Sequence, residues 1–189
     1  LAEGGQLHLN ETDTGIAGLR MVLSADEALP RVGDVDFLYE ATLLSDDTSG
    51  ITRQMNALFG LDDSNYTEII SDRFGYRGKL TLFEKDKLDR LEVIQPTKPG
   101  TTMDRFFRKF GQSLYMAFAE TSNINLIGER AAAAGAGFTL DRPDDRPPQL
   151  PSDQLWLHPS VLGGMMLGLS RPSMAWFWSG KPERVEAVA

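Results

Sequence analysis

Apolar residues along the chain follow strand-like and helix-like spacing in turn. Residues 35–44, VDFLYEATLL, are rich in the β-branched and aromatic residues that are typical of a strand. Four apolar residues at helical spacing come next: Ile51, Met55, Leu58 and Phe59. Gly60 is suited to end that helix. Three further short strands are expected at residues 67–70, 79–83 and 90–94. The first segment therefore has the pattern β–α–β–β–β.

The same order recurs in the second half of the chain. Residues 113–119, SLYMAFA, predict a strand, and Ser122 or Asn123 is expected to cap a helix that Gly135 ends. Three strands are again expected, at residues 137–140, 154–158 and 165–169. The repetition predicts an α+β protein built from paired βαβββ modules, residues 35–100 and 112–172.

The remaining segments are shorter and less regular. Residues 1–34 form an extension with a hairpin-like pair, QLHLN and IAGLRMVLS, around a turn at residues 12–15. Residues 102–111 predict an amphipathic linker helix. Residues 141–153 hold four prolines, which predicts an extended loop that could cover a cleft. Residues 173–189 are expected to be a C-terminal tail.

Composition and charge exclude several functional classes. The 189 residues carry a net charge of −8, and an acidic surface repels phosphate backbones, so we expect no nucleic-acid partner. No apolar run reaches the roughly 20 residues of a membrane span, so we expect a soluble protein without a membrane partner. The absence of cysteine excludes a thiolate nucleophile and a sulfur-based zinc site. No phosphate-binding glycine motif is present, so we expect no cofactor. Because no signal-peptide pattern is visible, we expect a cytoplasmic protein.

Three segments carry a resemblance to a known family. Residues 90–96, RLEVIQP, are similar to the sequence that ends the first module in that family. Residues 103–120, MDRFFRKFGQSLYMAFAE, resemble its inter-module helix and the strand after it, and residues 155–169, LWLHPSVLGGMMLGL, resemble its closing strand pair. On these segments the chain resembles the vicinal oxygen chelate superfamily, in its glyoxalase-like and methylmalonyl-CoA epimerase-like branch. The resemblance implies a glyoxalase-like domain over residues 35–172, a small-molecule ligand in a cleft, and a homodimer.

The resemblance also implies four inward strand positions that hold a divalent metal through His, Glu or Gln. In this chain the first position falls on Phe37 or Tyr39 and the second on Glu92. The third falls on Tyr115 and the fourth on Gly168. One suitable ligand of four remains, and a lone carboxylate does not hold a catalytic divalent ion. We therefore expect no metal at this place.

The remaining polar residues suggest acid–base chemistry. A carboxylate at Glu92 on an apolar sheet face is desolvated, which raises its pKa and suits a general base; the alternative is an ion pair with Arg90, on the same strand face. Tyr115 and Tyr39 could donate hydrogen bonds to a substrate oxygen in place of the missing cation, or be core tyrosines. His158 could take part in proton transfer, or have a structural or surface role.

Other residues are expected to bind the ligand. Phe37 and Met166 line the cleft in this interpretation, unless they fill it as core, and Gly168 leaves space where the family has a carboxylate. Arg73 and Arg77 lie in the turn SDRFGYRGK. They could receive a substrate carboxylate or the phosphates of a CoA-like ligand, or belong to a solvated hairpin tip.

Three functions follow as hypotheses. The first is a metal-independent isomerase or lyase that acts on a small oxo or acyl compound by proton transfer. The second is a protein that binds and sequesters a small aromatic or apolar compound, and the third is a structural module with a filled cleft. A raised pKa of Glu92 in an open pocket favours the enzyme, whereas Glu92 tied to Arg90 favours the binder.

Overall fold

The chain divides after Gly33 into two compact units. A computed structural model describes residues 6–11, 17–22 and 33–188. In the first unit, β1 (Gln6–Glu11) pairs antiparallel with β2 (Ala17–Val22) as a two-stranded sheet, which confirms the predicted hairpin strands. The turn predicted at residues 12–15 lies outside the described residues.

The second unit contains the two predicted modules. The first module consists of β3 (Phe37–Leu44), α1 (Thr48–Phe59), a short 3-10 turn η1 (Asp63–Asn65), β4 (Tyr66–Ser71), β5 (Tyr76–Leu82) and β6 (Arg90–Pro96). The linker helix is α2 (Thr102–Phe110). The second module consists of β7 (Ser113–Glu120), α3 (Ile124–Ala133), β8 (Phe138–Asp141), β9 (Gln154–Leu157) and β10 (Met166–Ser170). The predicted order β–α–β–β–β is present twice.

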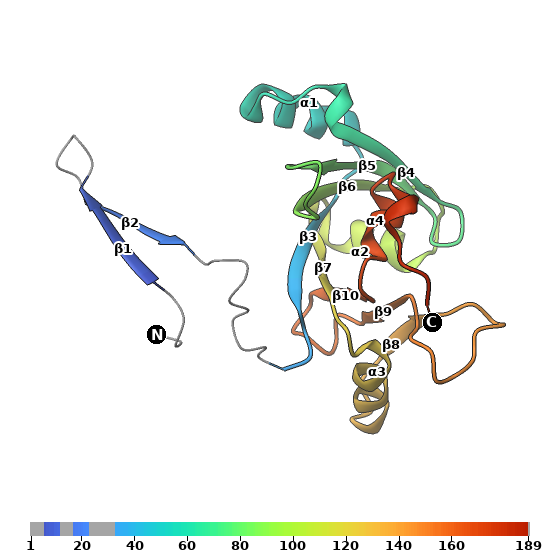
Figure 1. The fold of residues 1–189 in the computed structure, drawn as a ribbon. Helices are drawn as coiled ribbons and strands as arrows, with labels where there is room; N and C mark the ends of the chain where they lie inside the picture. The colour runs from blue at the N-terminus through green and yellow to red at the C-terminus, as the bar shows by residue number, and fades with distance from the viewer. Residues whose placement is uncertain (1–5, 12–16, 23–32, 189) are drawn as a thin grey trace. The chain divides into compact units, whose positions relative to one another are not determined.

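All eight strands of this unit form one curved sheet, in the order β4-β5-β6-β3-β7-β10-β9-β8. Within each module the first and last strands are parallel neighbours, β3 with β6 and β7 with β10. The modules join where β3 and β7 pair antiparallel. Figure 1 shows α1 and α3 at opposite ends of the sheet, which matches their contacts with β5 and β6 and with β8 and β9.

Local sequence explains where α1 begins and ends. The Asp47 side chain accepts a hydrogen bond from the Gly50 backbone N–H at 2.8 Å, which satisfies one donor of the first turn. Gly60 ends the helix with a φ of 68°, a left-handed conformation that glycine adopts without strain. Gly60 therefore ends this helix as predicted.

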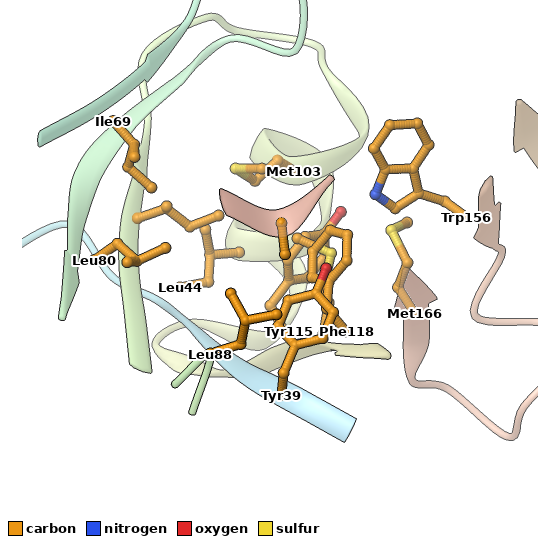
Figure 2. Packing of buried hydrophobic residues seen from close by; sticks show 13 residues of the cluster. Tyr39, Leu44, Ile69, Leu80, Leu88, Met103, Tyr115, Phe118, Trp156 and Met166 are labelled. Atoms are coloured by element: carbon orange, nitrogen blue, oxygen red, sulfur yellow. The ribbon is translucent and has the colours of Figure 1, made fainter. Parts of the chain in front are cut away.

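The main core lies on the inner face of the sheet and takes residues from both modules. Figure 2 draws this cluster, which includes Leu44 and Leu80 from the first module and Tyr115 and Phe118 from the second. Two short elements follow β10: α4 (Ala175–Trp178) and a 3-10 turn, η2 (Pro182–Arg184). Ala175 is fully buried in the same core. No helix in the described part of the chain is both long and apolar enough to cross a membrane.

Candidate active site

A cavity of about 660 Å³ opens on the inner face of the eight-stranded sheet. Its charged lining comes from five residues: Glu40, Arg73, Arg90, Glu92 and Arg105. Much of the remaining wall is aromatic or apolar, including Tyr76, Tyr115, Phe118, Trp156, Met166 and Trp178. A mostly apolar cavity with a few converging charged groups has the character of a small-molecule site.

The register of two parallel strands brings the acidic residues together. Glu40 of β3 lies opposite Arg90 of β6, and Thr42 lies opposite Glu92. Residues two apart on a strand point to the same face, so all four side chains reach the inner face of the sheet. All four residues are less than 9% exposed.

Arg90 is the buried cation of the site. Its Nε donates to Glu40 Oε2 at 2.6 Å, and both side chains are 2% exposed. Its Nη1 donates to the carbonyl oxygen of Ala175 at 2.9 Å and also to Ser179 Oγ. The predicted tail therefore packs against the site and supplies two acceptors to Arg90. The contact is a charge-assisted hydrogen bond between a guanidinium and a carboxyl group.

Thr42 links the two carboxyl groups. Its Oγ1 lies 2.9 Å from Glu40 Oε1 and 2.8 Å from Glu92 Oε2. Burial, and the negative charge of Glu40 beside it, raise the pKa of Glu92 well above its ordinary value. The side chains of Glu40 and Glu92 thus meet at the Thr42 hydroxyl, and Glu40 is also ion-paired with Arg90. We call Glu40 and Glu92 the carboxyl pair.

The two candidate tyrosines occupy different places. Tyr115 lines the cavity, and burial raises its pKa to about 12, so its hydroxyl keeps its proton and can donate a hydrogen bond. Tyr39 is buried beside the cavity, where its hydroxyl donates to Ser170 Oγ at 3.0 Å. Burial also raises the pKa of Tyr39 above its ordinary value. Tyr39 does not line the cavity, so its predicted contact with a substrate is corrected to a core position.

Three further expectations are corrected by the structure. Phe37 is 45% exposed and Arg77 is also exposed, and neither lines the cavity. Gly168 leaves no space, because the ring of Phe118 occupies it. Arg90, expected to bind the ligand and named as the alternative ion-pair partner of Glu92, lines the cavity and is ion-paired with Glu40.

A single irregularity explains why Glu40 was missed. The pairing of β3 with β7 shifts register between Leu38 and Glu40, so both Tyr39 and Glu40 are buried although they are neighbours in sequence. Strict alternation from Tyr39 places Glu40 on the outer face. The available signal was a charged residue, followed two positions later by Thr42, inside an otherwise apolar strand.

The packing of Gly168 predicts a measurable effect. A Cβ added there would lie 2.2 Å from Phe118 Cε1, so Gly168→Ala should destabilise the protein by about 1–3 kcal/mol through overpacking. Chemical denaturation measures this change. The double variant Gly168→Ala with Phe118→Leu should recover part of the loss, and a double variant as unstable as the two single changes added together would contradict the contact.

The mouth of the cavity carries positive charge from Arg73 and Arg105, which are both exposed. Arg73 Nη1 donates to Asp141 Oδ1 at 2.7 Å, which links the β4–β5 turn of the first module to the end of β8 in the second. His158 also lines the cavity, with its Nε2 2.9 Å from Thr139 Oγ1. The mouth is thus built from both modules.

The residues of the cavity do not fit the divalent metal that the resemblance implies. Among residues 6–11, 17–22 and 33–188, no three His, Asp or Glu side chains gather where they could hold a metal ion. Glu40 already has its counter-charge in Arg90, and a metal bound there would place a second cation beside that guanidinium. No step below is routed through a metal.

Comparison with solved structures relates this fold to known proteins. By sequence, no protein-family model and no curated protein matches the chain. By structure, methylmalonyl-CoA epimerase from Mycobacterium tuberculosis matches with a TM-score of 0.60 and 17% identity, over 76% of this chain and 93% of that chain. A Streptomyces coelicolor methylmalonyl-CoA epimerase variant in complex with 2-nitronate-propionyl-CoA matches with a TM-score of 0.59 and 15% identity, over 72% of this chain and 97% of that chain. A methylmalonyl-CoA epimerase in complex with methylmalonyl-CoA and NH4+ matches with a TM-score of 0.57 and 14% identity, over 71% of this chain and 92% of that chain.

These matches agree with the strand order and with the three sequence segments that resemble the family. At such low identities the likeness concerns the fold, and it covers the two modules together. The chain therefore has the vicinal oxygen chelate fold, in its glyoxalase-like arrangement of paired βαβββ modules.

Proposed function

We propose that this protein is a metal-independent isomerase or lyase that transfers a proton on a small oxo or acyl compound bound in the cavity. The observation that carries the proposal is the carboxyl pair on the wall of the cavity, where Glu40 is ion-paired with Arg90 and burial raises the pKa of Glu92. Enzymes that move protons need an acid and a base close together. Here the different surroundings of Glu40 and Glu92 separate their roles.

Glu40 takes the role of base in this proposal. Each of its oxygens accepts one hydrogen bond, from Arg90 or Thr42, and keeps a second lone pair. The carboxylate removes a proton from the carbon next to the substrate carbonyl, and the electron pair left behind forms an enolate. Tyr115 lines the same cavity, and in this proposal its hydroxyl donates a hydrogen bond to the enolate oxygen.

Glu92 takes the role of acid rather than base, because burial and the neighbouring Glu40 raise its pKa and so favour its protonated form. In an isomerase, Glu92 gives its proton to the substrate atom next to the carbon that Glu40 deprotonates. In a lyase, it gives the proton to the leaving group. Because Thr42 lies within 3 Å of both carboxyl groups, acid and base share one wall of the cavity. This placement favours a proton shift between neighbouring atoms on one face of the substrate.

The charge of the cavity indicates an anionic substrate. Three arginines and two glutamates line it, inside a protein of net charge −8, and Arg90 is ion-paired with Glu40. Two of the arginines, Arg73 and Arg105, lie at the mouth, where a substrate carboxylate or phosphate would meet them.

The proposal is tested by proton exchange. The protein is incubated in D2O with methylmalonyl-CoA, phenylpyruvate and 2-oxobutyrate, and NMR follows loss of the C–H signal next to each carbonyl. We expect catalysed exchange with at least one compound. Glu40→Gln should lower its rate at least about a hundredfold. Exchange no faster than in buffer for all three compounds would contradict the proposal.

Arg73 offers a specific prediction about affinity. Arg73→Gln should weaken binding of phenylpyruvate about tenfold, because a charge-assisted hydrogen bond to the carboxylate is lost. Quenching of tryptophan fluorescence from Trp156 and Trp178, which both line the cavity, measures this binding. Arg77→Gln is the matched control, since Arg77 is an exposed arginine of the same hairpin outside the cavity. Equal losses in the two variants would contradict a role for Arg73 at the mouth.

The aromatic lining also favours a second candidate, a protein that binds and sequesters a small aromatic compound. Phe118 and Trp156 contact each other edge to face, with ring centroids 6.5 Å apart, and both border the cavity. The same experiments separate the two candidates. Binding of a compound without any catalysed proton exchange supports sequestration.

A further inference from the structure

Thr42 lies behind the cavity wall and contacts both members of the carboxyl pair. Its residue exposure is 0%, and it is not among the cavity-lining side chains. A hydroxyl group has one proton, so Thr42 cannot donate to Glu40 and to Glu92 at once. Both short contacts are hydrogen bonds only if one carboxyl group is protonated and donates to Thr42 Oγ1.

The surroundings decide which carboxyl group that is. Arg90 donates to Glu40 and holds it as a carboxylate. Four polar residues surround Glu92. Glu40 and Thr42 lie on β3, Arg90 lies on the same strand as Glu92, and Tyr76 lies on β5. With burial and the charge of Glu40 both acting on it, Glu92 is the group that keeps the proton. The hydrogen bonds therefore run from Glu92 to Thr42 and from Thr42 to Glu40.

One turnover of the proposed reaction reverses the protonation states of Glu40 and Glu92. Glu40 has taken a proton from the substrate, and Glu92 has given one away. In that state Arg90 faces a neutral Glu40, and Glu92 is a buried carboxylate without a direct ion pair among the described side chains. The reversed state is costly, and it must be reset before the next substrate reacts.

We propose that Thr42 returns the proton from Glu40 to Glu92 after each turnover. The Glu40 Oε1–H gives its proton to Thr42 Oγ1, while the Thr42 hydroxyl proton passes to Glu92 Oε2. One proton leaves Glu40, one arrives at Glu92, and Thr42 is unchanged, so no co-reactant is needed. The inference rests on the proposed function, because that reaction creates the reversed state. Thr42 is a positioning residue, since it does not touch the substrate.

The test compares one turnover with many. The compound whose C–H exchanges fastest in the D2O assay is used. Its exchange is followed once with enzyme in excess over substrate and once with substrate in excess over enzyme. Thr42→Val removes the hydroxyl and keeps the shape, so the steady-state rate should fall at least about tenfold relative to the single-turnover rate. Thr42→Ser keeps the hydroxyl and should restore the ratio of the parent protein.

Thr81→Val is the matched control. Thr81 is also fully buried, on β5 of the same sheet, and its hydroxyl has no hydrogen-bond partner among the described residues. Its removal should leave the ratio of the two rates unchanged. A Thr42→Val protein that is folded by circular dichroism and keeps the parent ratio overturns the relay while the proposed function stands. Absence of exchange by the parent protein overturns the proposed function and the relay with it.

Discussion

Arg90→Met is expected to destabilise the protein by about 3–5 kcal/mol, because it leaves Glu40 buried without its counter-charge. Three acceptors each lose the hydrogen bond from Arg90: the Glu40 carboxylate, the Ala175 carbonyl and Ser179 Oγ. The last two anchor the segment that begins with α4. The free energy of unfolding, from chemical denaturation, measures the loss.

Two controls give this result its meaning. The double variant Arg90→Met with Glu40→Leu removes both charges, so it should recover much of the stability. Arg108→Met breaks an ion pair with Asp104 in which the arginine side chain is 67% exposed, and its effect should be small. A loss in Arg90→Met no larger than in Arg108→Met would show that the Arg90–Glu40 ion pair is not buried in solution.

Glu92→Gln is expected to remove a pH-dependent part of the stability and most of the activity. Because the pKa of Glu92 is raised in the folded protein, its contribution to stability is fully present below the ordinary glutamate pKa of about 4.3. It is lost as the pH rises from there through the folded pKa, at about 1.4 kcal/mol per pH unit. The glutamine side chain of the variant is neutral at every pH and can still donate to Thr42. The variant should therefore gain stability relative to the parent as the pH rises through that window, and keep a constant advantage above it.

The same substitution removes the proposed acid, so exchange should fall at least about a hundredfold while the fold is kept. Denaturation curves between pH 4 and 9 measure the first effect, and the D2O assay measures the second. Glu68→Gln, at an exposed position on β4, is the control for loss of one negative charge and should follow the parent curve. A Glu92→Gln stability that runs parallel to the parent at every pH would contradict a protonated Glu92.

The order of helices and strands was predictable because it depends on spacing within the chain. Apolar residues at period two and at helical period mark β3 and α1, and Gly60 marks the helix end through its own backbone freedom. The repeat of β–α–β–β–β then indicates a paired architecture from the residue pattern alone. These signals are local, which is why the predicted elements match the observed ones closely.

The candidate site was only partly predictable, because its chemistry depends on contacts between distant segments. Glu92 and Tyr115 line the cavity, at two of the four inward positions that the family resemblance implies. The register shift in β3 that turns Glu40 inward leaves no local mark in the sequence. The partner of Arg90 was sought on its own strand, whereas the parallel neighbour β3 presents Glu40 directly opposite. The contact with the Ala175 carbonyl joins residues 85 positions apart, which no local pattern reports.

The central claim is that Glu92 carries a proton at neutral pH beside an ionised Glu40. Infrared spectroscopy of protein labelled with 13C-glutamate separates the protonated carboxyl band of glutamic acid from the bands of carboxylates and of aspartate. At pH 7 we expect a protonated glutamic acid band that weakens in Glu92→Gln and is unchanged in Glu68→Gln. Identical bands in the parent protein and Glu92→Gln would contradict the account.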